Sequence, residues 1–174
     1  MKMNYFILKQ DKELKNAIKL EAFNNSEKMI LLKEDESKFR DTTSVRVKGN
    51  KNSVYPDLIE APVLMVSDEL HKIFKWYENT IIYKAAVFSD LNMKRQDVYR
   101  LVLPDIIDAI SDKTTYLKNG WADKIVLDKN KIGDYNIFRL KAGIEYYFVV
   151  SLDVVESMLK RNFMGIKFKE IEVV

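Results

Sequence analysis

The sequence is poor in the residues that most often carry chemistry in proteins. Its 174 residues include no cysteine, one histidine (His71), five glycines and three prolines. Without cysteine there is no disulfide, thiolate metal site or cysteine nucleophile. A single histidine excludes a site built from several imidazoles, and neither G-x-G-x-x-G nor G-x-x-x-x-G-K-[ST] occurs. We therefore expect no cofactor, no resident metal and no enzymatic activity.

Long hydrophobic runs and a charge excess of one sign are also missing. No stretch approaches the roughly 20 apolar residues that span a membrane, and the apolar run near the N-terminus is too short for a signal peptide. The 29 basic and 26 acidic residues give a net charge of +3 and are spread along the chain, without the basic block of a nucleic-acid binder. We expect a cytoplasmic protein that binds neither membrane nor nucleic acid.

What the chain does have is the composition of a globular domain. Hydrophobic residues make up 47% and aromatic residues 11% of it, which excludes wholesale disorder. A chain of this length buries roughly 70% of its unfolded surface. We therefore predict one domain over residues 1–174, of the α+β class and rich in strands.

Strand patterns recur throughout the sequence. Ser44–Lys48 alternates apolar and polar residues, as a half-buried strand does. The other runs are short, apolar and rich in β-branched or aromatic residues, and a Gly133-Asp134 turn separates two of them. We expect strands at residues 4–9, 44–48, 63–66, 80–88, 96–103, 124–127, 135–140, 147–151 and 166–171.

The clearest helix follows Ser67. This serine can cap a helix, and Asp68 and Glu69 place negative charge in its first turn. An apolar stripe follows at Leu70, Ile73, Phe74 and Tyr77. Weaker patterns favour helices at 11–23, after Pro104 and at 154–159, whereas residues 33–43 are expected to form a loop.

Two segments of the chain are similar to each other. Residues 63–83 and 147–168 both contain a compact apolar strand, a serine cap, an amphipathic helix and a second strand. We interpret them as an internal duplication of a strand–helix–strand unit, with coincidence between two common patterns as the alternative.

Two groups of polar residues could carry chemistry. His71 falls on the polar side of its helix without an adjacent carboxylate, which favours a partly exposed surface histidine over a catalytic base. Asp105, Asp108 and Asp112 would share one face of the short helix after Pro104 and could hold a hard cation. Their spacing equally suits the solvated side of an amphipathic helix, which is the interpretation we prefer.

Aromatic residues are the better candidates for binding. Trp76, Tyr116 and Trp121 are expected near the surface, and Trp121 lies in the turn-like sequence Lys118–Asp123. Tryptophan and tyrosine are enriched at the energetic centres of protein interfaces. We take these three as candidate partner-binding residues, although packing against the core is the interpretation we prefer for Trp121.

Three blocks of the sequence carry a family resemblance. Tyr55–Leu70 contains Y-P-D-L-I followed by V-L-M-V-S-D-E-L, and further blocks are Ile125–Leu140 and Phe148–Phe168. Together they resemble a family of immunity proteins from bacterial polymorphic-toxin systems, formerly a domain of unknown function. The resemblance covers about residues 55–174 and leaves 1–54 without a match, apart from the N-terminal strand.

The resemblance implies a cytoplasmic, non-enzymatic protein that binds and neutralises a cognate toxin. The family has no catalytic residues or known toxin-contact motif to transfer to this chain. The sequence leaves open which toxin is bound and the oligomeric state. A regulatory or small-molecule-binding module is the alternative function, and a carboxylate-dependent enzyme ranks last.

Overall fold

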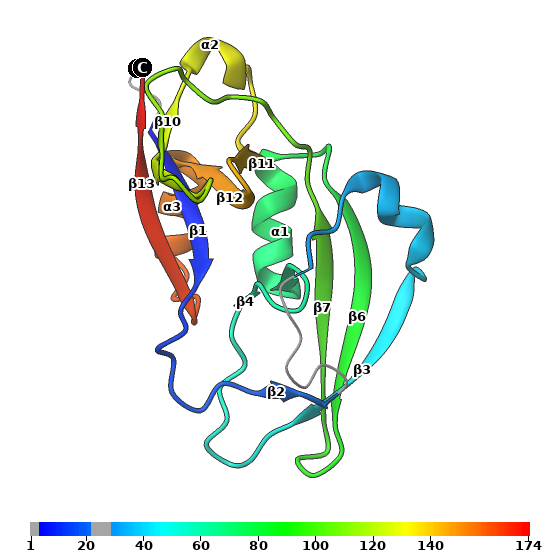
Figure 1. Cartoon of the computed structure of the whole chain (residues 1–174). Coiled ribbons are helices and arrows are strands. Elements are labelled where there is room, and N and C mark those ends of the chain that lie inside the picture. Colours follow the sequence, from blue (N-terminus) through cyan, green and yellow to red (C-terminus); the bar gives the residue numbers. More distant parts are fainter. Residues whose placement is uncertain (1–3, 22–28) are drawn as a thin grey trace.

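The computed structural model describes residues 4–21 and 29–174 (Figure 1). Within these residues the fold is α+β and dominated by strands, as the sequence predicts. The strands are β1 (Tyr5–Gln10), β2 (Lys19–Leu20), β3 (Thr42–Lys48), β4 (Leu58–Ile59), β5 (Met65–Ser67), β6 (Ile82–Asp90), β7 (Arg95–Leu103), β8 (Thr115–Tyr116), β9 (Ala122–Lys124), β10 (Val126–Leu127), β11 (Ile137–Ala142), β12 (Glu145–Ser151) and β13 (Ile166–Val173). The helices are the 3₁₀ helix η2 (Lys33–Lys38) and the α-helices α1 (Asp68–Tyr77), α2 (Lys129–Ile132) and α3 (Leu152–Leu159).

The strands form two large sheets and a small hairpin. The five-stranded sheet has the order β10-β13-β1-β12-β11, and the six-stranded sheet has the order β2-β3-β6-β7-β5-β4. Most neighbours are antiparallel, whereas β10 with β13 and β3 with β6 are parallel. β8 and β9 pair with each other in a separate two-stranded sheet.

Each large sheet contains a strand–helix–strand unit that encloses a third strand. In β5–α1–β6 the enclosed strand is β7, and in β12–α3–β13 it is β1. Because the enclosed strand is antiparallel to both of its neighbours, the two strands of each unit run parallel to each other. The segments that resemble each other in sequence thus share a local topology, while their origin by duplication stays a prediction.

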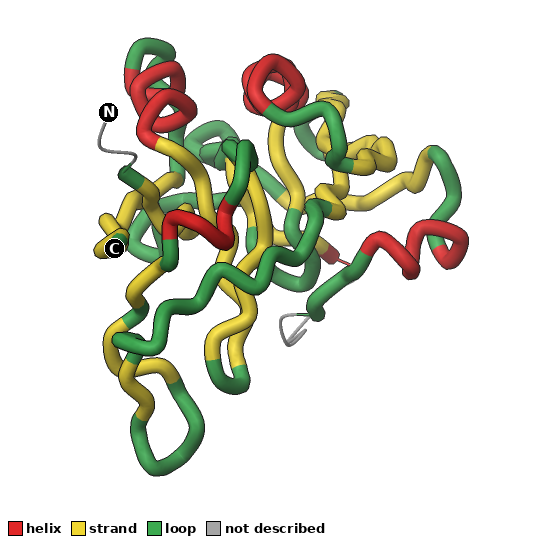
Figure 2. Tube along the Cα trace, turned by 90° about the horizontal axis from the view of Figure 1, so that it is seen from above, coloured by secondary structure: helices red, strands yellow, loops and turns green. Residues whose placement is uncertain are grey.

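Helices α1 and α3 pack on the same side of the two sheets (Figure 2). Phe74 of α1 and Phe148 of β12 meet edge to face with ring centroids 5.7 Å apart. The Tyr77 hydroxyl lies 2.5 Å from the Ser157 hydroxyl of α3. Residues from both helices and both sheets therefore form one buried cluster, which we call the central core.

The faces of the two sheets that point away from the central core are covered by other segments of the chain. Residues 104–112 and α2 cover the five-stranded sheet, where Ala109 and Ile132 are fully buried. Leu31 and Phe39 cover the six-stranded sheet. Arg139 of β11 is only 4% exposed and donates a hydrogen bond to the Leu31 carbonyl at 2.5 Å, which ties the five-stranded sheet to the segment that covers the six-stranded sheet.

The helix expected after Pro104 is absent, because this segment instead forms isolated β-bridges at Ile106 and Ile110 and contains no helical turn. The Ile107 N–H donates to the Arg139 carbonyl at 2.9 Å, and the Arg139 N–H donates to the Asp105 carbonyl at 2.7 Å. This segment therefore pairs with the outer edge of β11 at Arg139. A short helix would leave those edge groups unpaired, and its isoleucines favour extended backbone.

Other local predictions also need correction. Of residues 11–23, the described part contains turns and the two-residue strand β2, and the rest lies outside the described residues. Asp11 accepts the Glu13 N–H, and Asn16 has a positive φ of 60°, which a helix does not tolerate. Residues 33–43, expected as loop, contain η2 and the start of β3. None of the described helices is long and apolar enough to cross a bilayer.

Candidate functional site

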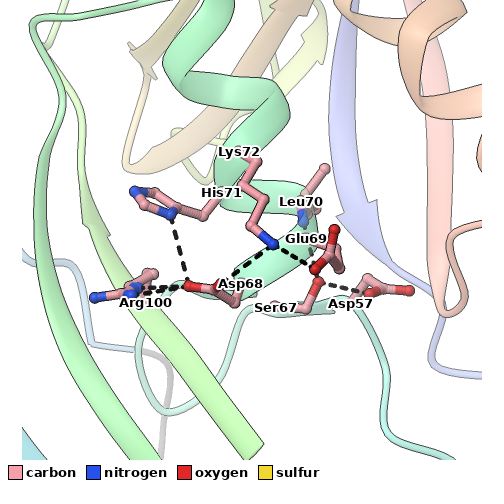
Figure 3. Close-up of polar contacts among 8 residues, drawn as sticks. All are labelled: Asp57, Ser67, Asp68, Glu69, Leu70, His71, Lys72 and Arg100. Carbon is pink, nitrogen blue, oxygen red and sulfur yellow. Dashed lines mark hydrogen bonds and ion pairs between the residues drawn. The ribbon is translucent and has the colours of Figure 1, made fainter.

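The start of α1 holds the polar cluster around the only histidine (Figure 3). Ser67 caps the helix as expected, since its hydroxyl oxygen accepts the Leu70 N–H at 3.3 Å. The same hydroxyl donates to Asp57 at 2.6 Å, and the other Asp57 oxygen accepts the Met164 N–H at 2.7 Å. Ser67 is therefore fully engaged in holding α1 to the neighbouring loops.

Asp68 is the centre of the charged part of the cluster. One of its oxygens accepts hydrogen bonds from Arg100 Nε at 3.0 Å and Nη2 at 2.8 Å. Lys72 lies 3.6 Å from its other oxygen. Burial alone would raise the pKa of Asp68, but Arg100, Lys72 and His71 together lower it below its ordinary value.

His71 is less exposed and better partnered than the sequence suggests. Its side chain is 14% exposed, and Nδ1 lies 3.8 Å from an Asp68 oxygen. The ring meets Tyr83 of β6 edge to face at 4.4 Å. The expectation of no neighbouring carboxylate was wrong, because a residue three positions earlier lies on the same helix face.

This cluster lacks the geometry of a catalytic relay. The distance from His71 to Asp68 exceeds that of a hydrogen bond, and in Figure 3 the imidazole points away from Ser67. Burial and the charge of Arg100 lower the pKa of His71, so the ring is neutral at neutral pH. The arrangement fixes α1 to β7 and brings no nucleophile to the histidine.

The three aspartates considered for a cation are not brought together. Residues 104–112 form no helix that would align them, and Asp105 instead pairs with Lys33 at 2.6 Å. Across residues 4–21 and 29–174 there is no group of three or more histidine or carboxylate side chains placed to hold a metal ion.

The β8–β9 hairpin forms a second kind of site. Gly120 in its turn and Gly143 in the β11–β12 turn have positive φ angles of 85° and 62°. A Cβ atom on Gly143 would lie 2.1 Å from the Gly120 carbonyl oxygen, which shows how closely the two turns approach. Trp121 forms a β-bridge with Gly143, and the Ile144 N–H donates to the Gly120 carbonyl at 3.2 Å. The two glycines therefore allow the hairpin to dock on the sheet.

Four large apolar side chains are exposed where these turns meet. Tyr116 is 47%, Leu117 50%, Trp121 43% and Ile144 60% exposed. We call these four residues the hairpin patch. Single exposed apolar residues need no explanation, but a contiguous group is characteristic of a binding surface.

A groove of about 690 Å³ adjoins the hairpin patch, and we call it the hairpin groove. Its walls include Trp121–Ile125 on the hairpin side and Lys169–Val173 on β13. Lys9 of β1 and Tyr147 of β12 also line it, and they continue into a second groove of about 410 Å³. The surface beside the hairpin patch is thus hollowed and carries side chains of both positive and negative charge.

The charges of the hairpin groove are partly paired. Lys124 lies 2.6 Å from Glu172 and lowers the pKa of that carboxylate. Burial, together with a hydrogen bond to Glu145, raises the pKa of Tyr147 to about 12. Lys9 lies 6.0 Å from the centre of the Tyr147 ring. A carboxylate with a lowered pKa is suited to an ion pair rather than to general acid catalysis.

The structure thus brings together two of the three aromatic candidates. Tyr116 and Trp121 belong to the hairpin patch, and the 43% exposure of Trp121 counts against its packing in the core. Trp76 lies on α1, is 67% exposed and packs against Arg161 at 5.2 Å from the ring centre. It is not part of the hairpin patch.

Sequence reasoning missed Leu117, Ile144 and the groove. One signal was present, because Gly143-Ile144 forms a two-residue turn between β11 and β12 and an isoleucine at such a position is exposed. The groove has no local signal, since its walls come from distant segments. Comparison with known proteins found no matching family model and no matching curated protein.

Proposed function

We propose that the protein is a non-catalytic binder that recognises a partner protein through the hairpin patch. The observation that carries this proposal is the exposure of Tyr116, Leu117, Trp121 and Ile144 on two turns that contact each other, with Trp121 also lining a groove. Aromatic side chains flanked by charged ones have the composition of an interface centre and its rim.

The sequence resemblance suggests what the partner is. The blocks Tyr55–Leu70, Ile125–Leu140 and Phe148–Phe168 resemble toxin-immunity proteins, so we propose a cognate bacterial toxin, neutralised in the cytoplasm by occlusion or by locking its conformation. We further propose that β5–α1–β6 and β12–α3–β13 arose by duplication, supported by their shared topology.

The first experiment mixes the protein with the product of the adjacent gene. We expect a stable complex by size-exclusion chromatography, and rescue of growth when both proteins are produced in one cell. Absence of binding at micromolar concentration would contradict the proposal.

Alanine variants of two tryptophans test the location of the interface. Trp121→Ala should weaken the complex at least about tenfold, because truncation of a central aromatic residue costs on the order of 2 kcal/mol. Trp76→Ala is the matched control and should leave affinity unchanged. A loss on Trp76→Ala with no effect of Trp121→Ala would move the interface to α1.

A small-molecule-binding module is the second candidate, favoured by the volume of the hairpin groove. Ligand pockets commonly have volumes of about 300–1,000 Å³. Their walls are mostly apolar, however, whereas Lys9 and Lys169 contribute charge to this groove. Native mass spectrometry of the purified protein tests this alternative, which predicts a retained small ligand.

A further inference from the structure

The strand β13 has one free edge along most of its length. It pairs with β1 over Ile166–Ile171 but with β10 only at Glu172 and Val173. Among the described residues no strand lies on the outer side of 166–171, and Figure 1 shows β13 at the margin of the molecule. An unpaired edge presents backbone donors and acceptors to any extended chain.

The hydrogen bonds at the two ends of β13 show which of its residues direct their backbone N–H and C=O groups to the free outer side. On the outer side, the Val174 N–H donates to Leu127 and the Val174 carbonyl accepts from Lys129, both at 2.9 Å. On the inner side, the Gly165 carbonyl accepts the Asp11 N–H at 2.8 Å. Backbone direction alternates along a strand. Even-numbered residues, Phe168 and Glu170 among them, therefore direct their N–H and C=O groups outward.

The side chains of β13 are sorted by charge between its two faces. Lys167, Lys169 and Ile171 lie on the face of the hairpin groove, because Ile171 packs in the cluster beneath that face. Phe168 lies on the other face, against the central core, and Glu170 shares that face by alternation. Lys169 forms none of the ion pairs found among the described residues, so its charge is open to a partner.

This sorting disfavours a second copy of the same chain. When two β13 edges pair antiparallel, hydrogen-bonding residues face hydrogen-bonding residues, so even positions oppose even ones and odd oppose odd. In every such register the lysines of both strands gather on one face and their glutamates on the other. The like charges on each face would repel one another. The occupant is therefore a strand of different sequence.

We propose that the partner adds an extended segment to the free edge of β13, with acidic side chains facing Lys169. This inference rests on the proposed function and specifies the binding mode. The hairpin groove connects the two surfaces, since Trp121 and Lys169 both line it. A strand at the edge would gain backbone hydrogen bonds from β13 and apolar contact from the hairpin patch.

A blocked octapeptide of alternating threonine and glutamate tests the edge directly. Titrated into isotope-labelled protein, it should shift the amide resonances of Phe168 and Glu170 more than those of Lys169. The same peptide N-methylated at every residue should not bind, because neither of its edges can then donate backbone hydrogen bonds to β13. Equal binding of the two peptides, or shifts confined to another surface, would overturn the proposal.

Variants of the protein separate the contribution of backbone hydrogen bonds to peptide binding from the contribution of side-chain charge. Glu170→Pro removes an outward N–H that the β1 ladder does not use, and should abolish peptide binding, while Glu170→Ala should retain it. Lys169→Glu should weaken binding about fivefold, as expected for reversal of one exposed charge. Circular dichroism checks that Glu170→Pro folds, and if it does not, the N-methylated peptide decides the question on the unaltered protein.

Hydrogen exchange of the complex with the adjacent-gene product distinguishes this inference from the proposed function. Protection of the Phe168 and Glu170 amides on binding is expected. A complex that leaves both amides exchanging overturns strand addition but not partner binding. If no complex forms, the proposed function fails, and the peptide titration still decides whether the edge binds extended chain.

Discussion

At the residue scale, Asp68 links helix to sheet through charge. It accepts both hydrogen bonds from Arg100 of β7, and it lies in the first turn of α1, where the helix dipole favours an anion. Its pKa is below the ordinary value in the folded protein. The ionised form therefore stabilises the fold above the unfolded pKa, and this contribution is lost as pH falls through the folded pKa.

We predict that Asp68→Asn lowers the free energy of unfolding at neutral pH by less than about 1 kcal/mol, because the pair is partly exposed. As pH falls through the lowered pKa of folded Asp68, the variant and the unaltered protein should converge, since Asp68 then becomes protonated in both the folded and the unfolded state. Urea unfolding at a series of pH values measures this difference. Asp108→Asn, at an exposed position, is the control, and a constant difference at all pH values would contradict the prediction.

At the scale of elements, two glycines determine where the β8–β9 hairpin lies. Gly143 has both a positive φ and a close neighbour in the Gly120 carbonyl. Gly133 has a similar φ of 63°, but a Cβ atom added to it would meet no atom within 4 Å. Comparison of Gly143 with Gly133 therefore separates backbone strain from steric exclusion.

Gly133→Ala should cost roughly 1–3 kcal/mol of unfolding free energy, because its φ of 63° and ψ of −139° lie in a region that residues with a Cβ atom rarely adopt. Gly143→Ala should cost at least about 1 kcal/mol more, because the hairpin must also move away. It should weaken partner binding as well, since the β8–β9 turn would no longer contact the β11–β12 turn and the residues of the hairpin patch would move apart. Thermal unfolding and binding measured in parallel check this, and equal losses for both variants would show that the turns do not need this close approach.

Secondary structure was predictable where side-chain pattern decides it. The serine cap and apolar stripe identify α1, and runs of β-branched residues identify β6 and β7. Residues 104–112 were mispredicted because their hydrogen-bond partners on β11 are distant in sequence. Tyr116 and Trp121 could be chosen from the sequence because residue type alone suggested them. The hairpin groove and the free edge of β13 could not be predicted, because both depend on how distant segments are arranged.

At the scale of the whole molecule, the central core joins both sheets. Phe74 is fully buried and contacts Phe148 across the boundary between the two sheets. A core that is shared in this way couples the unfolding of the two sheets, so we expect a single cooperative unfolding transition.

Phe74→Ala should lower stability by about 3–5 kcal/mol, the usual cost of removing a buried phenylalanine. Hydrogen exchange should show an equal loss of protection in β6–β7 and in β1–β12. Loss confined to the six-stranded sheet would mean that the halves unfold independently and that residues 1–174 are not one domain.

The position of β1 has a consequence for the order in which the protein is made. β1 lies between β12 and β13, so its neighbours on both sides come from residues 145–173. During synthesis this strand leaves the ribosome long before either neighbour exists, and its apolar residues Tyr5, Ile7 and Leu8 have no sheet to join. The five-stranded sheet forms only when the last strands arrive, so a nascent chain that stops before β13 cannot complete the groove through which we propose the partner is bound.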